Sequence, residues 1–509
     1  MKKSICLYFQ VHQPTRLRQY RFFDIGKDSH YYDDFADRTI LRRIAQRCYI
    51  PMNNLLLDLI KRHGSDFKVT FSITGSALEQ FERYAPDVLD SFRELAKTGC
   101  VEFLGETYYH SLASLANFGE FKHQVEKHSA AIERYFGVKP TAFRNTELIY
   151  SDSIGRDVYN LGFKVMLAEG ARHILGWKSP DYIYTDSQQK HLKLLLRNYS
   201  LSDDIAFRFS DRGWKDWPLT GEKYLSWLKA ADGDIVNLFM DYETFGEHQK
   251  ESSGIFDFMR YLPEILLKDG SFEFVTPTQA ARKLKPIAEI EVQDPISWAD
   301  EERDVTAWLG NELQQDAYNK LYGQAEKLAI LNDPVLWEDF GHLQESDHLY
   351  YMSTKFFSDG EVHSYFNPYN TPYEAFINYM NVLSDFIIRI DDAMTTSGKK
   401  VKDSASAGSA TDVKKTIVRK PLKKVASAGS ATDVKKTIVR KPLKKVASAS
   451  SATTNKVAVR KRVAKESSSK VSVPKKAAKP VTSVTEPVEV AVSTKKSTKT
   501  KTTKQVKKK

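Results

Sequence analysis

The chain has 509 residues, of which 41% are hydrophobic and 12% aromatic, enough for more than one globular domain with a large core. It contains no run of 18 or more apolar residues, and its first apolar run, residues 4–12, is interrupted by Gln10 and His12. We therefore predict a first strand rather than a signal peptide, no membrane span, and a cytoplasmic location. The three cysteines form no CxxC pair, which argues against a disulfide framework.

The net charge of +11 is divided very unevenly along the chain. Residues 397–509 carry 32 Lys and Arg against 6 Asp and Glu, a net of +26, whereas the rest of the chain has a net of −15. No aromatic residue follows Phe386, so this C-terminal segment cannot bury enough apolar surface to offset its chain entropy. We predict a disordered basic tail behind an acidic globular body.

The tail also contains a perfect tandem duplication of 21 residues, at positions 405–425 and 426–446. A fixed period can indicate a structural array, but two copies without an apolar face cannot bury a continuous core. The repeat is therefore interpreted as a duplicated disordered segment.

Strand-like runs alternate with amphipathic segments through the first 280 residues. The helical segments include residues 86–97 and 120–135, whose apolar positions recur at helical spacing. This alternation is typical of a parallel sheet with crossover helices, which we expect to close into a barrel. The predicted strands are residues 4–12, 67–75, 101–106, 141–147, 163–170 and 234–241.

A further strand-to-helix step follows at residues 271–284, and the pattern then changes. From about residue 298 to residue 394 the helical period dominates, as in residues 306–330 and 372–390. The predicted domains are an α/β barrel (1–290), a helical domain that completes the cleft (291–396), and the Lys-rich tail (397–509).

Polar side chains follow several of the predicted strands, at the point where each strand ends. Because the carboxyl ends of parallel strands meet at one edge, these groups are expected to form one site. A single histidine in such a place is usually structural, but joint placement at four strands favours a site. The residues concerned are His12 and Gln13, Glu106 and His110, Glu147, and Asp241.

Cleavage of a glycosidic bond requires one carboxylate and one carboxylic acid with opposite protonation at the working pH. Arg144 precedes Glu147 and would keep that carboxyl ionised if the fold brings the two together. Asp241 stands near Glu243 and Glu247, and neighbouring like charges or burial would favour its protonated form. Glu147 and Asp241 are therefore the candidate catalytic pair.

Aromatic residues stand beside these acids, at Tyr108, Tyr109, Tyr242 and Phe245. Aromatic planes can pack against the apolar C–H faces of sugars, although rings in such segments can equally belong to the core. We expect Tyr242 to line a sugar cleft.

Five segments resemble, in the same order, the five sequence regions of glycoside hydrolase family 57. The resemblance spans about residues 1–395, excludes the tail, and is greatest to the short α-amylase type. The segments are His12–Gln13–Pro14, GETYYH (105–110), FRNTE (143–147), MDYETFGEHQ (240–249) and WADEERDVTAWLGN (298–311).

This resemblance implies a retaining enzyme acting on α-glucans, built on an incomplete seven-stranded β/α barrel followed by a helical domain. It implies Glu147 as nucleophile and Asp241 as general acid/base, with no metal and no cofactor. His12 would line the subsite of the cleaved sugar, and Trp298 and Asp300 would close the cleft from the helical region. The implied substrate-binding residues are His12, Gln13, Glu106, His110, Tyr242, Trp298 and Asp300.

Two alternative enzymes remain open. A 4-α-glucanotransferase on the same scaffold differs only in using a sugar hydroxyl instead of water as the acceptor, whereas branching relatives are generally longer. A zinc-dependent deacetylase or α-mannosidase could also use His and acidic residues at strand ends. However, His123 and His128 are five residues apart, and the chain has no HxxxH or HExxH motif.

A hypothesis from another class concerns the tail. Lys residues interspersed with Ser, Ala, Thr, Val and Pro resemble the tails of linker histones, and such charge would bind phosphates without sequence preference. A solubilising or spacing role is the alternative. Non-specific nucleic acid is therefore a candidate partner of residues 397–509, beside an α-glucan substrate for the body.

Overall fold

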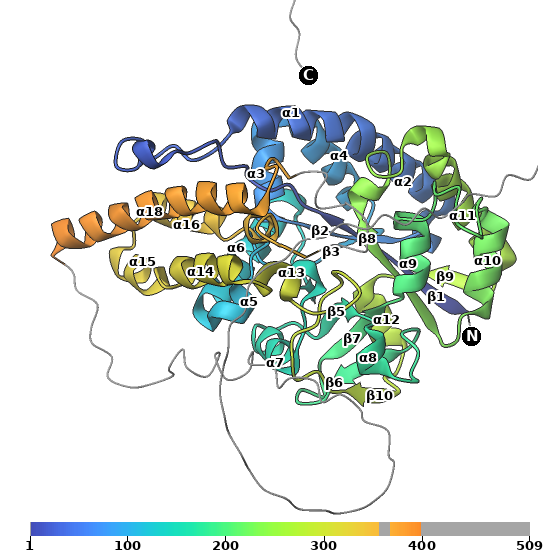
Figure 1. Cartoon of the computed structure of the whole chain (residues 1–509). Helices are drawn as coiled ribbons and strands as arrows, with labels where there is room; N and C mark the ends of the chain where they lie inside the picture. Colours follow the sequence, from blue (N-terminus) through green and yellow to red (C-terminus); the bar gives the residue numbers. More distant parts are fainter. Residues whose placement is uncertain (1, 356–366, 399–509) are drawn as a thin grey trace, which may run out of the picture. The chain divides into compact units, whose positions relative to one another are not determined.

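The computed structural model describes residues 2–355 and 367–398 (Figure 1). By its internal contacts the chain divides into Met1–Ala410 and Thr411–Lys509, and the described residues belong to the first unit. The predicted basic tail and its repeat lie outside the described residues from Lys399 onward. Of the helices that are described, none is long and apolar enough to cross a membrane.

Ten strands within the described ranges form two sheets of five. In the first sheet the order is β3-β2-β1-β8, with β9 also beside β1, and all pairs are parallel. In the second the order is β10-β6-β7-β5-β4, and only β6 and β7 are antiparallel. The strands are β1 (Lys3–Val11), β2 (Val69–Ile73), β3 (Val101–Phe103), β4 (Ala142–Arg144), β5 (Val165–Glu169), β6 (Ile183–Asp186), β7 (Lys193–Arg197), β8 (Ile235–Asp241), β9 (Phe272–Phe274) and β10 (Ala288–Ile290).

Hydrogen bonds connect the two sheets at both sides. Beyond β3, the amide of Gly105 donates to Ala142 O (2.9 Å) and the amide of Arg144 donates to Gly105 O (2.9 Å), which aligns β3 with β4. At the other side, the Asn237 side chain in β8 donates to Leu196 O in β7 (2.9 Å). The structure is therefore a mixed α/β fold with parallel sheets, and the expected number of seven barrel strands stays a prediction.

Helices surround these sheets (Figure 1). The short 3-10 segments are η1 (Phe22–Asp24), η3 (Gly64–Asp66), η4 (Thr146–Leu148), η5 (Tyr242–Thr244) and η6 (Glu251–Ser253), and η2 (Ala45–Tyr49) is a π-helix. The α-helices are α1 (Asp34–Ile44), α2 (Ile50–His63), α3 (Gly75–Tyr84), α4 (Pro86–Lys97), α5 (Ala113–Ala116), α6 (Phe118–Phe136), α7 (Asp152–Asn160), α8 (Arg172–Leu175), α9 (Tyr199–Ala206), α10 (Gly221–Ala230), α11 (Ile255–Asp269), α12 (Pro277–Lys283), α13 (Thr306–Leu309), α14 (Glu312–Tyr322), α15 (Ala325–Leu331), α16 (Pro334–Leu343), α17 (Ser346–Tyr350) and α18 (Pro372–Ser397).

Capping residues explain where several helices begin. Asn117 accepts hydrogen bonds from the first amides of α6. Asp333 and Thr371 cap α16 and α18 in the same way, and these two helices begin with a proline. Thr276 and Gln279 form a capping box at the start of α12. These short-range signals make the helix limits largely a property of the local sequence.

The six predicted strands and the predicted helix at residues 86–97 are confirmed, with ends that shift by a few residues. The helical pattern predicted at 306–330 is confirmed as three helices, α13, α14 and α15; Gly310 ends α13 and Asn311 caps α14. The hairpin of β6 and β7 and the long helical segment of α1, η2 and α2 were not predicted. The domain limits at residues 290 and 396 stay predictions.

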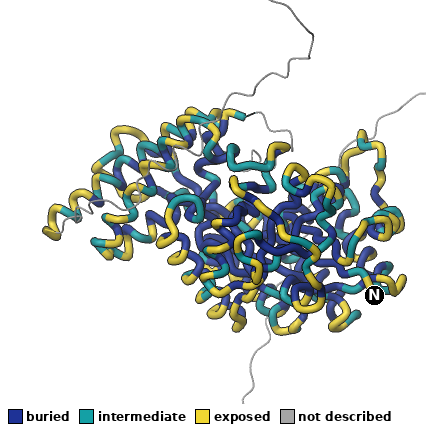
Figure 2. The backbone as a smooth tube through the Cα atoms, turned by 90° about the horizontal axis from the view of Figure 1, so that it is seen from below, coloured by how far each residue is buried: buried dark blue, intermediate teal, exposed yellow. Residues whose placement is uncertain are grey.

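Three buried apolar clusters hold these elements together. Figure 2 shows that the buried residues gather in the interior and the exposed ones at the periphery. One cluster packs the first sheet against α1 to α4, α10 and α11, and a second packs the other sheet against α14, α16 and α18. The third includes Tyr8, Leu148, Leu195 and Phe239 and therefore lies between residues of both sheets. Cys6, Cys48 and Cys100 are free thiols in the interior.

Leu383 in α18 offers a test of how firmly the C-terminal helix is integrated into the body. Its side chain is fully buried, so Leu383→Ala should lower the free energy of unfolding by about 2–5 kcal/mol through lost burial and an unfilled cavity. Urea denaturation measures this change. Ile388→Ala on the same helix is the control, because Ile388 is 43% exposed and its loss should cost less than about 1 kcal/mol. Equal effects would contradict the packing of α18.

Candidate active site

The polar residues expected to meet do follow strands that run in parallel. In the register of β1 and β8, Gln10 lies opposite Asp241, and His12 comes just after β1 ends. Glu106 follows β3 and Glu147 follows β4, the strand aligned with β3 through Gly105. Parallel pairing thus places these strand ends at one edge of the sheets.

Glu147 is held in an unusual backbone conformation. Its φ is 54° and its ψ 28°, and Leu148 after it also has a positive φ, in the left-handed region that residues with a side chain rarely occupy. His110, Asp300 and Arg303 share this feature. Such positions cost of order 1–3 kcal/mol each and cluster at functional sites.

Both carboxylate oxygens of Glu147 receive hydrogen bonds. His110 Nε2 lies 2.8 Å from Oε1, and the indole Nε1–H of Trp298 donates to Oε2 at 2.5 Å. Glu147 is only 5% exposed, so these two donors replace water around the charge. They come from segments about 190 residues apart in the sequence.

His110 carries a positive charge at neutral pH. Burial alone would lower the pKa of His110, but the carboxylates of Glu106 (3.7 Å from Nδ1) and Glu147 outweigh it and raise the pKa to about 9. Burial would likewise raise the pKa of Glu106, but His110, His128 and Arg144 outweigh burial and lower it. A charged imidazolium therefore lies between two carboxylates.

His12 packs flat against His110, with ring centroids 4.1 Å apart and an interplanar angle of 21°. Its Nδ1 lies 2.9 Å from Thr74 Oγ1 and its Nε2 lies 2.9 Å from Asp347 Oδ2. Asp347 belongs to α17, so a helix near residue 350 orients a ring at residue 12. The sequence analysis did not identify Asp347.

Gln13 lies deeper, in a buried network beside the strand that ends at Asp241. Its amide donates to Tyr49 Oη (3.0 Å) and to Glu243 Oε1 (3.4 Å), and Tyr49 also donates to Glu243. Burial, and secondly the charge of Asp241, raises the pKa of Glu243 to about 8. Glu243 is therefore mostly protonated at neutral pH and adds little negative charge next to Asp241.

The structure does not bring Tyr242 into the cleft. Its ring is fully buried among Phe9, Phe71 and Phe92, and its hydroxyl donates to Asn53 Oδ1 at 2.6 Å. The physical reason is the alternation along an extended chain: Asp241 lines a pocket, so the next side chain points to the opposite face.

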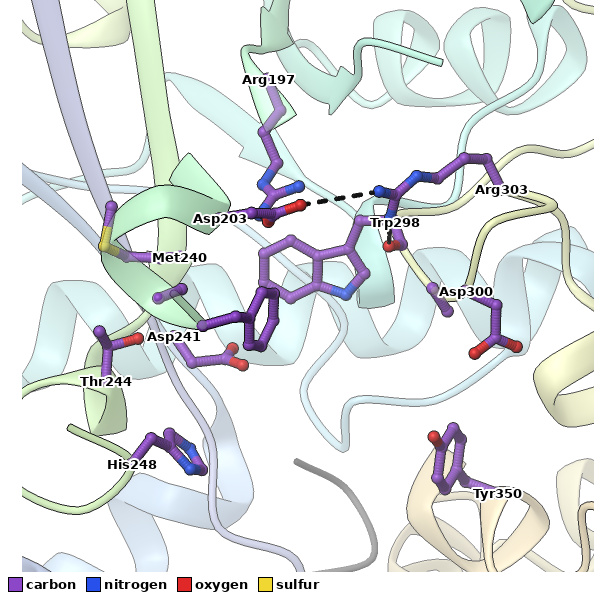
Figure 3. Close-up of a pocket in the computed structure, with 13 residues that line it drawn as sticks. Arg197, Asp203, Met240, Asp241, Thr244, His248, Trp298, Asp300, Arg303 and Tyr350 are labelled. Atoms are coloured by element: carbon purple, nitrogen blue, oxygen red, sulfur yellow. Dashed lines mark hydrogen bonds and ion pairs between the residues drawn. The ribbon is translucent and has the colours of Figure 1, made fainter. Parts of the chain in front are cut away.

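Asp241 opens onto a small pocket (Figure 3). Trp298 and Asp300, which the sequence analysis predicted, line it as well. Glu147 is not among the lining residues, and Trp298 is the side chain that both lines the pocket and contacts Glu147. The full lining is Arg197, Asp203, Ala206, Phe207, Met240, Asp241, Thr244, His248, Trp298, Ala299, Asp300, Arg303 and Tyr350.

Several of these pocket residues were not predicted from the sequence. Arg197 donates to Asp203 Oδ1 (2.5 Å) and Glu169 Oε2 (3.4 Å), and Asp203 lies 3.9 Å from Arg303 (Figure 3). Arg197 ends β7 after a run of leucines, so the strand-end rule applied to residues 193–197 would have found it. Tyr350 shares a face of α17 with Asp347, for which the sequence gives no comparable signal.

No group of three or more His, Cys, Asp or Glu residues that could hold a metal ion occurs in residues 2–355 and 367–398. His128, one of the two histidines weighed for zinc, has other partners. Its Nε2 donates to Ile73 O (2.8 Å), its Nδ1 accepts from the Glu106 amide (3.3 Å), and burial lowers its pKa. Both ring nitrogens are thus occupied by the backbone.

Comparison with known proteins agrees with this geometry. The sequence model described as glycosyl hydrolase family 57 matches residues 6–293. The chain belongs to this family. A protein of Methanocaldococcus jannaschii named "Putative alpha-amylase" is 43% identical over 409 residues, which cover 77% of this chain and 86% of that protein. The chain is therefore a glycoside hydrolase.

Solved structures agree on the fold. A branching enzyme of Pyrococcus horikoshii superposes with a TM-score of 0.56 at 14% identity, over 78% of this chain and 95% of that chain. A 4-alpha-glucanotransferase of Thermococcus litoralis gives 0.51 at 14% identity, over 68% of this chain and 56% of that chain. At these identities the similarity concerns the fold alone.

The pKa of His110 makes stability depend on pH. Native His110 keeps its proton up to about pH 9, whereas the unfolded residue releases it near 6.5. The stabilisation is complete below 6.5 and is lost as the pH rises to 9, because the unfolded state then binds fewer protons. We expect His110→Gln to reduce this fall in unfolding free energy, measured by urea denaturation at several pH values. The exposed His30→Gln should leave the slope unchanged, and an unchanged slope in His110→Gln would contradict the charged imidazolium.

Proposed function

We propose that the protein is a retaining α-amylase that cleaves α-1,4-glucosidic bonds in glucans of the starch and glycogen type. The observation that carries this proposal is the arrangement of Glu147, with hydrogen-bond donors on both carboxylate oxygens, beside a pocket lined by Asp241. The family supplies the reaction class, and the amylase name of a relative with 43% identity favours hydrolysis.

In the proposed mechanism, Glu147 attacks the anomeric carbon while Asp241 gives its proton to the departing glycosidic oxygen. The bond to the leaving sugar breaks as the ester bond to Glu147 forms. Asp241 then takes a proton from water, which attacks the anomeric carbon and releases Glu147 as a carboxylate. His110 and Trp298 would hold the carboxylate in the orientation for attack throughout.

The remaining predicted site residues fit this proposal to different degrees. His12, Glu106 and His110 form one contiguous polar group next to Glu147. His12 would contact the sugar at the point of cleavage, whereas Glu106 is completely buried and would act through His110, which bonds Glu147. Asp300 lines the pocket with Trp298, 3.4 Å from Lys355, and would bind a neighbouring sugar. Gln13 would act indirectly, by fixing Glu243 behind Asp241.

The scaffold is proposed to be a single incomplete barrel of seven strands with a helical domain after residue 290. The backbone contacts between β3 and β4, and between β7 and β8, support a ring formed by β1 to β5, β7 and β8. Packing of α14, α16 and α18 in one apolar cluster supports the helical domain.

Replacing either acid should stop turnover without unfolding the protein. We expect Glu147→Gln and Asp241→Asn each to lower kcat on maltoheptaose by at least about a thousandfold, since each removes a group that reacts directly. Azide should restore activity to Asp241→Asn only with a substrate whose leaving group departs without a proton. Circular dichroism and the unfolding midpoint serve as controls for folding. A Glu147→Gln variant with near-normal turnover would overturn the assignment.

The products of maltoheptaose distinguish hydrolysis from transfer. Oligosaccharides shorter than the substrate alone indicate water as the acceptor, as proposed. A ladder both above and below seven glucose units would indicate the 4-α-glucanotransferase instead.

A second proposal concerns residues 397–509, whose net charge of +26 favours non-specific binding of nucleic acid. We expect a variant ending at Gly398, which keeps the whole of α18, to lose DNA and RNA affinity while its glucan cleavage stays within about twofold. Fluorescence anisotropy at increasing salt measures the binding, which should weaken steeply with ionic strength. Affinity that survives the truncation would show that the tail is not the binding element.

A further inference from the structure

The indole of Trp298 is surrounded by charge. The guanidinium carbon of Arg144 lies 5.0 Å from the ring centroid, and that of Arg197 lies 5.4 Å from it. Both distances are within the range in which a cation is attracted to the face of an aromatic ring. We call Arg144, Trp298 and Arg197 the indole cluster.

Backbone contacts also fix Trp298 relative to Glu147. The Trp298 amide donates to the backbone oxygen of Glu147 at 3.2 Å, in addition to the indole bond to its carboxylate. The Arg303 guanidinium donates to Trp298 O, and Ser297 Oγ donates to Asp304 O at 2.6 Å, which closes the loop around the tryptophan. Trp298 is thus bonded to Glu147 through both its backbone and its side chain.

Arg144 is held mainly by the Trp298 ring and by one carboxylate. It is completely buried, and its guanidinium makes no hydrogen bond to another side chain or to the backbone in the described part of the chain. Glu106 lies 3.9 Å away, between Arg144 Nη1 and Glu106 Oε2. The face of the Trp298 ring is therefore one of the few protein groups that match the charge of Arg144, and the two side chains fix one another.

Arg197 is anchored quite differently. Its Nε donates to Phe239 O at 2.8 Å, and its other nitrogens contact Glu169 and Asp203. It therefore presents a fixed cation to the indole at the wall of the pocket that contains Asp241. The indole cluster connects the pocket to the buried acid.

We propose that Trp298 is a positioning residue for the reaction, which orients the attacking oxygen of Glu147, and that Arg144 and Arg197 fix its ring for this purpose. The inference rests on the proposed role of Glu147 as nucleophile. It differs from the expectation that Trp298 closes the cleft and binds substrate, for example as a platform for a sugar ring. A platform contributes to substrate binding, whereas a positioning donor acts on the rate of attack.

The test is Trp298→Phe, which keeps an aromatic ring and removes the N–H donor. We expect kcat on maltoheptaose to fall about 10- to 100-fold, somewhat less than the loss of one oxyanion donor because His110 still bonds the Glu147 carboxylate, with KM within about twofold. In a Glu147→Gln background, the Kd of maltoheptaose should also change less than about twofold. Trp227→Phe in α10 is the matched control and should keep both parameters, since Trp227 contacts Trp214 and Tyr224 outside the pocket.

Arg144 gives an independent arm of the test. Arg144→Met should lower kcat about tenfold at constant KM, and Arg144→Lys, which keeps the charge, should restore most of that loss. The pH–rate profile separates positioning from a direct effect of charge: a loss of kcat in Arg144→Met with an unchanged acid limb supports positioning through the indole, whereas a shifted acid limb would mean that Arg144 acts on the charge of Glu147 instead. If Arg144→Met and Arg144→Lys have the same kcat, the charge of Arg144 does not contribute to positioning and this part of the proposal is wrong.

Failure of this inference and failure of the proposed function give different results. If Trp298→Phe raises KM and Kd while kcat is kept, Trp298 is a sugar platform and the positioning role is wrong. The positioning role is also wrong if Trp298→Phe has the kcat and KM of the wild type while Glu147→Gln is inactive. If Glu147→Gln itself retains turnover, the proposed function fails first.

Discussion

The buried carboxylate of Glu147 is the group on which the other contacts of this site depend. Glu147 has almost no contact with water, so its charge must be matched by protein donors, which His110 and Trp298 supply. His110 can do so as a cation because Glu106 on its other side and Glu147 itself together raise its pKa. Each donor thus needs a second layer of partners, and that layer extends from β3 to the segment after residue 296.

The candidate acids could be predicted because they obey a local rule. Strands such as β1 and β8 are largely apolar and buried along almost their whole length, and the polar residues at their carboxyl ends lie at the edge where parallel strands end. The same rule would have found Arg197 had the strand at 193–197 been recognised. That strand pairs antiparallel with β6, so it departs from the strand-helix alternation on which the prediction relied.

Other parts of the site depend on contacts that leave no local pattern. Asp347 reaches His12 across more than 330 positions, and nothing in the sequence of α17 marks it as a partner of the first strand. Tyr242 shows the opposite error: an aromatic residue next to a catalytic candidate was expected to face the sugar. Adjacent side chains on an extended segment point to opposite faces, so the position next to Asp241 belongs to the core.

The left-handed backbone at His110, Glu147, Leu148, Asp300 and Arg303 has a consequence for how activity would decay. Each of these conformations is maintained by surrounding contacts and would relax if they loosened. Asp300 and Arg303 belong to the loop that carries Trp298, whereas Glu147 follows β4, and the indole of Trp298 bonds Glu147. A movement of the loop away from Glu147 would therefore let the backbone relax in both segments. Moderate heating would therefore abolish activity through local rearrangement of these segments, at temperatures below those that unfold the apolar clusters.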